Sequence, residues 1–564
     1  MNTFSELQYT RPDMGQIHKN LEDYIRNLEA APDYETARNL FLSYKKSQGD
    51  LRTMTSIAHI RNTIDTNDAF YEGEMEFFHR ELPKLALVTK KADEALLSSP
   101  FRPQFEAEFG SILLKNMENQ KRFADERIVE DQVKEGQLTQ KYSKTSASCT
   151  TMFRGKKCNF YGLLKSMQST DRTERKEAFE AWADLYEKVS GELDAQYDAL
   201  VALRTGMARK LGFDSYTQMA YLQRRRYDYT PEDVANFRRQ VLEIIVPACT
   251  KLYQQQASRL GIEKLHYYDE ALVYPDGNAI PHGTTAELVA KAQKMYQELS
   301  PQTGAFFDFM AEHQLFDLET KPGKRPGGYC TSLPSYKAPF IFSNFNGTSA
   351  DVDVLTHEAG HAFESFTASR LLPLAEQVFS TSEINEIHSM TMEHFTYPWM
   401  ELFFGDKADR YRYAHLAQCL EVIPYMVCVD EFQHRVYEKP SMSARERRAV
   451  WHELELKYMP WRDYDGNSFL EEGGFWMQKQ HIFLYPFYYI DYALAQLGAF
   501  ELYDRMKKDR TQAWADYYRL CQAGGSRGYF ELLDIANLSN PFREGSVERV
   551  VSGVLEELFS KKVQ

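Results

Sequence analysis

The spacing of hydrophobic residues predicts helices over most of this chain. No proline occurs between Pro103 and Pro231, and apolar residues recur every three or four positions through residues 172–213, which is the period of an amphipathic helix. The sequence TPED at 230–233 predicts a helix start, with a capping hydroxyl, a proline and acids in the first turn. The helix that follows is expected to bend near Pro247.

Two windows interrupt the helical pattern. Residues 146–167 are rich in Ser, Thr and Gly and predict a short hairpin or loop excursion. Residues 272–348 alternate glycine and proline turns with β-prone segments, and PFIFSNFNGT at 339–348 predicts an exposed strand. The helical pattern resumes at residue 352 and continues almost to the end. The sequence therefore predicts a mainly α fold with a small sheet just before the motif HEAGH at 357–361.

Composition and charge narrow the class of protein. Hydrophobic residues make up 43% and charged residues 26% of the 564 positions, as in globular proteins with ample core material. The net charge of -14 argues against a nucleic-acid partner. The densest basic cluster, RRR at 224–226, is too short to follow a phosphate backbone, so we expect a solvated or ion-paired turn there.

Cysteines and apolar runs bear on the compartment. The seven cysteines are scattered and form no CxxC pair, which favours reduced thiols over a disulfide framework. The first residues lack the basic and apolar regions of a signal peptide, and the longest apolar runs are too short for a membrane span. We therefore expect a cytoplasmic protein without a membrane partner.

The motif HEAGH carries the clearest chemical signal. His357 and His361 lie four positions apart, on one face of a helix, so both imidazoles can bind one cation. Glu358 points away from that face and can act as general base towards a water on the metal. A pair of core histidines is the plainer alternative. A structural zinc would need four protein ligands, and no cysteine lies between residues 331 and 418.

The residues that follow HEAGH exclude two commoner zinc families. Metzincins place a glycine and a histidine where this chain has Glu364 and Thr367. Aminopeptidases with a glutamate 18 residues further on would need it at Ser380. Glu386 lies 25 positions beyond His361 (386 minus 361), in a new helical segment. Glu383 and His388 remain alternatives for the third ligand, and Glu364 could orient a ligand or lie at the surface.

HEAGH followed by EIHSMTME at 386–393 resembles the thimet oligopeptidase and oligoendopeptidase F family, M3, and most closely its bacterial Pz-peptidase type. The segments 323–330, 340–361 and 481–495 also resemble that family. The resemblance implies one Zn²⁺ per chain, with Glu386 as the third ligand beside the two histidines and Glu358 as the base. Glu393 follows on the same helix face and could be a supporting carboxylate.

The resemblance also implies an architecture and an activity. We expect a mainly α, two-lobed metallopeptidase with a deep substrate channel, whose N-terminal lobe covers residues 1–205 and whose catalytic lobe covers 206–564. The implied function is a zinc endopeptidase that hydrolyses internal bonds of short oligopeptides. The alternative is a catalytically inactive peptide-binding protein on the same fold.

Further candidates surround the predicted zinc helix. His481, Tyr488 and Tyr492 could stabilise the oxyanion, although tyrosines on a helix more often serve packing. Tyr485 is a further candidate in the same segment. An edge strand formed by GGYCT or PFIFSNFNGT could pair with an extended peptide, and Arg325 and Tyr329 could contact it. Gly473 and Gly474 suggest a mobile loop that closes over substrate.

Overall fold

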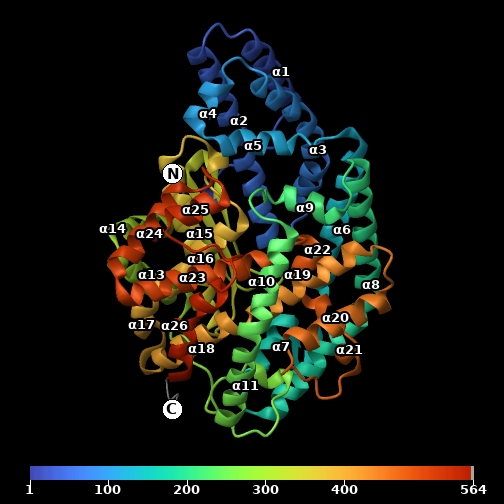
Figure 1. Cartoon of the computed structure of the whole chain (residues 1–564), viewed down its shortest axis with the longest axis vertical. Helices are drawn as coiled ribbons and strands as arrows, with labels where there is room; N and C mark the ends of the chain where they lie inside the picture. The colour runs from blue at the N-terminus through green and yellow to red at the C-terminus, as the bar shows by residue number, and fades with distance from the viewer. Residues whose placement is uncertain (561–564) are drawn as a thin grey trace.

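A computed structural model describes residues 1–560 and confirms the mainly α fold (Figure 1). The helices of the N-terminal part are α1 (Met14–Glu29), α2 (Tyr34–Ile64), α3 (Ala69–Leu97), α4 (Arg102–Phe109), α5 (Ser111–Gln120), α6 (Val129–Ser148), α7 (Phe160–Ser166), α8 (Arg172–Lys210) and α9 (Tyr216–Gln223). Those of the middle are α10 (Pro231–Gln240), α11 (Val246–Leu260), α12 (Tyr267–Glu270), α13 (Thr285–Leu299), α14 (Pro301–Glu312), α15 (Ala350–Leu371), α16 (Ser382–Phe395), α17 (Met400–Phe404) and α18 (Ala408–Glu421). The remainder are α19 (Ile423–Glu438), α20 (Ala444–Tyr458), α21 (Ser468–Glu471), α22 (Gln480–Leu484), α23 (Ile490–Lys508), α24 (Arg510–Ala523), α25 (Tyr529–Ile535) and α26 (Ser546–Ser560).

Two hydrophobic cores support these helices. Helices α1 to α5 project at the top of Figure 1 and enclose a core of their own, which includes Phe41 and Phe78. A larger core runs through the rest of the molecule. The long helix α2 contributes to both, with Phe41 in the first and Ile57 and Ile60 in the second. The predicted boundary between residues 205 and 206 falls inside α8, and the division into two lobes stays a prediction.

Several local predictions are confirmed. Strands β1 (Thr151–Phe153) and β2 (Lys156–Cys158) form the antiparallel hairpin expected within 146–167. Thr230 caps α10 in a reciprocal box with Asp233. A π-helical turn separates α10 from α11, so the helical path is irregular directly before Pro247, where a bend was expected.

The small sheet consists of β3 (Phe316–Glu319), β4 (Tyr329–Leu333) and β5 (Ala338–Phe345), in the order β3-β5-β4. Strand β5 is parallel to β3 and antiparallel to β4. The prediction that residues 339–348 form an exposed strand was wrong, because β5 lies between two strands, packs against α15 and is almost entirely buried. Its nearly continuous apolar run is typical of a strand covered on both faces. Strand β4 is the half-buried edge instead.

Two further expectations concern the basic cluster at 224–226 and the glycines at 473 and 474. Arg226 is buried and pairs with Asp491 at 2.5 Å, so this residue of the basic cluster is ion-paired rather than solvated. A Cβ on Gly473 would lie 2.1 Å from the carbonyl oxygen of Arg448, and one on Gly474 would lie 2.5 Å from the Phe469 ring. Close packing therefore accounts for both glycines without a mobile loop.

None of the helices within residues 1–560 combines the length and the apolar character needed to cross a bilayer.

Candidate metal centre

Helix α15 carries HEAGH, and its start is fixed by its own first turn. The Asp351 carboxylate accepts hydrogen bonds from the backbone amides of Asn346 and Gly347, each at 2.8 Å. These bonds tie the end of β5 to the beginning of α15, where a negative charge is also favoured by the helix dipole. The small sheet therefore positions the helix that carries both histidines.

Gly360, inside the motif, sets the distance between α15 and α16. A Cβ at this position would lie 2.6 Å from both the carbonyl oxygen of His388 and the Cα of Ser389. Only glycine allows two helix backbones to approach this closely. The contact brings the histidines of α15 opposite Glu386 of α16.

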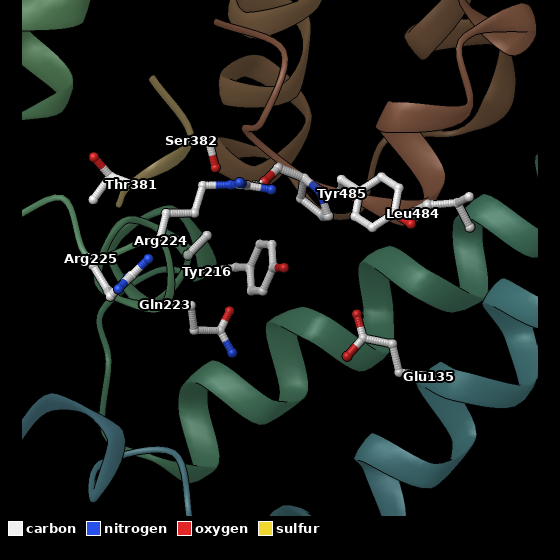
Figure 2. Close-up of a pocket in the computed structure, with 11 residues that line it drawn as sticks. Glu135, Tyr216, Gln223, Arg224, Arg225, Thr381, Ser382, Leu484 and Tyr485 are labelled. Carbon is white, nitrogen blue, oxygen red and sulfur yellow. Dashed lines mark hydrogen bonds between the residues drawn. The ribbon is translucent and has the colours of Figure 1, made fainter. Parts of the chain in front are cut away.

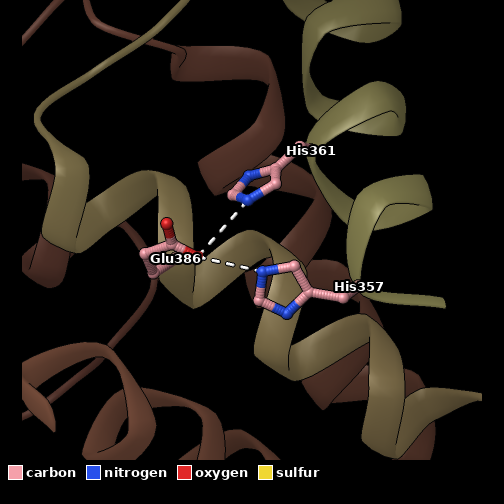
Figure 3. Close-up of side chains that lie close together, drawn as sticks. All are labelled: His357, His361 and Glu386. Atoms are coloured by element: carbon pink, nitrogen blue, oxygen red, sulfur yellow. Dashed lines mark ion pairs between the residues drawn. The ribbon is translucent and has the colours of Figure 1, made fainter. Parts of the chain in front are cut away.

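The three predicted ligands meet at one point (Figure 3). The Nε2 atoms of His357 and His361 lie 3.2 Å and 3.3 Å from the Oε2 atom of Glu386. All three donor atoms lie within 4.8 Å of one another. Two imidazoles and one carboxylate form the donor set of catalytic zinc sites, which leave a fourth position for water or substrate. The residues present therefore fit a zinc ion.

A buried chain of hydrogen bonds extends behind this cluster. The Nδ1 atom of His357 lies 2.6 Å from Oε1 of Glu393, whose Oε2 lies 2.9 Å from Nε2 of His415. The Tyr397 hydroxyl lies 2.6 Å from Nδ1 of His415. Burial alone would raise the pKa of Glu393, but the hydrogen bonds from both histidines lower that pKa to about 2. An ionised Glu393 fixes His357 with Nε2 directed at the cluster.

Sequence reasoning missed His415. It lies on α18, far from HEAGH along the chain, and no motif or spacing in the sequence marks it.

Glu358 lies beside the cluster but outside the three-ligand set. Its side chain is 6% exposed, and its Oε2 atom has no hydrogen-bond partner among residues 1–560. Burial raises the pKa of this carboxyl group, and the charges of His357 and His361 act in the opposite direction. A Cβ on Gly328 would lie 3.3 Å from Oε1 of Glu358. The glycine before β4 therefore keeps space open in front of the carboxylate.

The alternative ligands lie elsewhere. Glu383 accepts a hydrogen bond from the Tyr229 hydroxyl at 3.0 Å. His388 is fully buried, with Nδ1 3.5 Å from the Sγ atom of Cys521. Glu364 is also buried, so a surface position is excluded for it, and it is not part of the three-ligand cluster.

The segment 481–492 reaches the cluster from α22, the start of α23 and the turn between them. The Tyr488 hydroxyl donates a hydrogen bond to Oε1 of Glu386. The His481 ring centroid lies 5.7 Å from that of Tyr488 and 5.8 Å from that of Tyr492. Burial lowers the pKa of His481 to about 3, and its Nδ1 atom has no partner within residues 1–560. The structure thus brings these predicted residues together, with a neutral imidazole among them.

Known protein families match most of this chain. The sequence profile described as Peptidase family M3 matches residues 165–551, and that of the Peptidase M3 N-terminal domain matches residues 4–124. This chain belongs to Peptidase family M3. The resemblance inferred from HEAGH and residues 386–393 is therefore confirmed.

Solved structures of M3 peptidases cover the whole chain. A structure of Pz peptidase A with an inhibitor is 44% identical, covers 99% of each chain and superposes with a TM-score of 0.97. An X-ray structure provisionally described as oligoendopeptidase F is 45% identical, covers 100% of this chain and 99% of its own, and gives a TM-score of 0.98.

Curated M3 relatives are more distant. Group B oligopeptidase PepB of Streptococcus agalactiae is 25% identical over 381 residues, which are 65% of this chain and 60% of that protein. The match thus spans only about three-fifths of that relative's length.

Proposed function

We propose that this chain is a zinc-dependent endopeptidase that hydrolyses internal peptide bonds of short oligopeptides in the cytoplasm. The observation that carries the proposal is the convergence of His357, His361 and Glu386 beside an unpartnered Glu358 carboxylate oxygen. Membership in Peptidase family M3 supports peptide-bond hydrolysis. A protein that only binds peptides has no use for a carboxylate held in this position.

In this proposal His357, His361 and Glu386 hold one Zn²⁺. When bound, zinc supplies the Lewis acidity that acidifies water and polarises the peptide carbonyl. Glu358 accepts the proton of the attacking water and delivers it to the leaving amine nitrogen. Its buried Oε2 atom, which has no hydrogen-bond partner within residues 1–560, suits a group that must change protonation state twice in each cycle.

His481, Tyr488 and Tyr492 act on the other side of the scissile bond. A neutral His481 imidazole retains one N–H to donate to the developing oxyanion. Tyr488 holds Glu386 through its hydroxyl. Tyr492 lies close enough to Glu386 and Glu358 for their charges to raise its pKa, after the larger effect of burial. Its neutral hydroxyl is a second candidate donor.

Strand β4 supplies the peptide-binding edge. It is half-buried, adjoins Glu358 through Gly328, and among residues 1–560 has a strand partner, β5, on one side only. Main-chain hydrogen bonds to such an edge bind extended peptides with little selectivity for side chains.

The test compares wild type with Glu358→Gln. We expect about one zinc per chain in both proteins, by metal analysis, and an activity loss of about 10³-fold in the variant on a quenched fluorescent peptide. Unchanged activity in the variant would refute the proposed role of Glu358. Peptide binding without hydrolysis by the zinc-loaded wild type would instead favour the inactive peptide-binding protein.

A further inference from the structure

A pocket of about 310 Å³ adjoins the candidate metal centre (Figure 2). Figure 2 shows Arg224 extending along it towards Tyr485. The Arg224 guanidinium lies 4.9 Å from the ring centroid of Tyr488, whose hydroxyl contacts Glu386. The Tyr485 ring lies 6.0 Å from that of His481. Tyr485 and Tyr488 therefore connect the lining of the pocket to His481 and Glu386.

The charges that line this pocket do not balance. Arg225 donates to the Ser380 carbonyl oxygen at 2.6 Å and forms no ion pair with any residue in 1–560. The one carboxylate in the lining, Glu135, is bound to Arg204 at 2.6 Å. Arg224 lies 3.9 Å from Asp491, but Arg226 holds that carboxylate more closely, at 2.5 Å. The arginines of the pocket are therefore only partly neutralised, because Glu383 and Glu376 act on Arg225 without bonding to it.

The start of α16 adds donors to the same pocket. Thr381 and Ser382 line it, and Thr381, at the N-cap position, makes no side-chain capping hydrogen bond. The Oγ1 atom of Thr381 is buried without a partner among residues 1–560. Uncapped amides at a helix start attract negative charge. Two arginines and this helix end thus face a common space.

The direction of the peptide connects this pocket to one end of the substrate. A peptide that pairs antiparallel with β4, the more stable pairing mode, directs its C-terminal side towards the beginning of that strand. Arg325 precedes β4, and its guanidinium lies 3.4 Å from the Tyr485 hydroxyl. Tyr485 is 42% exposed and lines the pocket. The C-terminal side of the peptide therefore approaches the two arginines.

We infer that this pocket binds a carboxylate of the peptide on the C-terminal side of the cleaved bond. The carboxylate is either the free C-terminus or an aspartate or glutamate side chain. This inference rests on the proposed function and adds a substrate class to it: oligopeptides cleaved at a short, fixed distance before a negative charge.

The test uses two matched pairs of peptides with an internal fluorophore and a quencher on a lysine side chain. One pair differs in a C-terminal acid or amide, and the other, amidated at the C-terminus, differs in aspartate or asparagine after the cleaved bond. For wild type we expect kcat/KM to be about tenfold higher for the charged member of one pair. The pair that responds identifies the source of the carboxylate.

Variants of Arg225 connect that preference to the pocket. In Arg225→Gln we expect the charged-to-neutral ratio of kcat/KM to fall towards one, through a lower kcat/KM for the charged peptide. Arg225→Lys should keep most of the preference. Arg52→Gln is the matched control, because Arg52 lies near enough to influence Arg225 but does not line the pocket. Its ratio should equal that of wild type.

Two outcomes would overturn the inference: equal rates for both members of both pairs in wild type, or an unchanged ratio in Arg225→Gln. Absence of hydrolysis of every peptide would mark failure of the proposed function instead. Fluorescence anisotropy of the same peptide sequences, carrying the fluorophore without the quencher, on Glu358→Gln protein then decides the inference separately. We expect about tenfold tighter binding of the charged peptide, and equal affinities would refute the pocket's role.

Discussion

The two sides of the candidate site differ in how their polar groups are held. On the helix pair, α15 and α16, both carboxylate oxygens of Glu386 and of Glu393 have partners. On the aromatic segment, residues 481–492, His481 keeps an unpartnered nitrogen and Tyr485 is exposed. Metal ligands need fixed positions, whereas groups that meet substrate need free donors. Apart from Glu358 on α15, whose Oε2 atom is also unpartnered within residues 1–560, and Tyr488, which bonds to Glu386, the structure thus separates a rigid ligand side from a substrate side.

The largest expected effect comes from removing the free donor on the substrate side. His481→Phe keeps a ring of similar size but no N–H, so we expect kcat to fall about 10²-fold to 10³-fold, with the zinc content unchanged. Steady-state kinetics and metal analysis measure both. Tyr489→Phe is the control, because its ring lies 4.9 Å from that of His481. Loss of zinc in His481→Phe would contradict the separation of the two sides.

Weakening the hydrogen bonds behind the metal ligands should instead reduce the affinity for zinc. Glu393→Gln weakens the bonds that orient His357 and His415, so we expect zinc affinity to fall about 10-fold to 100-fold, as measured by competition with a chelator. Glu383→Gln, on the same helix but bonded to Tyr229, should leave the affinity unchanged. An unaltered affinity in Glu393→Gln would mean that the buried chain behind His357 does not position it.

Helix spacing provides a third test of the rigid side. Gly360→Ala places a methyl group 2.6 Å from the backbone of α16, so we expect a loss of at least about 1–3 kcal/mol in unfolding free energy and weaker zinc binding. Gly191→Ala in α8 meets no atom within 4 Å and should stabilise by about 0.5–1 kcal/mol. Thermal unfolding of the metal-free proteins compares them. Equal melting temperatures would show that α16 can retreat from α15.

The smallest effect concerns pH. Burial holds the pKa of His481 at about 3, below its ordinary value of 6.5. The neutral imidazole therefore contributes its full stability to the fold above the ordinary pKa, and this contribution is lost as pH falls towards 3. His481→Phe should therefore lose less stability than wild type between about pH 7.5 and about pH 5, by about 1 kcal/mol. Parallel losses in both proteins would exclude a neutral, buried imidazole.

Local rules predicted the helices and their caps. The proline-free stretch, the TPED start and the i, i+4 histidines depend on neighbours within a turn or two, and the structure has them as expected. The segment 339–348 was placed wrongly at the surface because its covering elements, β3 and α15, could not be inferred from its own sequence.

The parts of the site that depend on distant segments could not be predicted. Nothing near His415 indicates that it will meet Glu393. The environment of the basic cluster could not be predicted either, because Arg226 contacts Asp491 only through tertiary packing. Glu386 was selected through a family resemblance, since spacing alone left Glu383 and His388 open as ligands.

Helix α2 has a mechanical consequence. Its 31 residues extend over about 45 Å, from the core of α1 to α5 at one end to strand β4 at the other. At that end the Thr63 hydroxyl lies 2.6 Å from that of Tyr329. Earlier in α2, the Thr53 hydroxyl lies 2.9 Å from that of Ser335, just after β4. A tilt of the N-terminal helices as a body would therefore displace β4, the proposed peptide-binding edge, or break these contacts. A ligand or crosslink that immobilises the top of the molecule would therefore alter turnover without touching the catalytic groups.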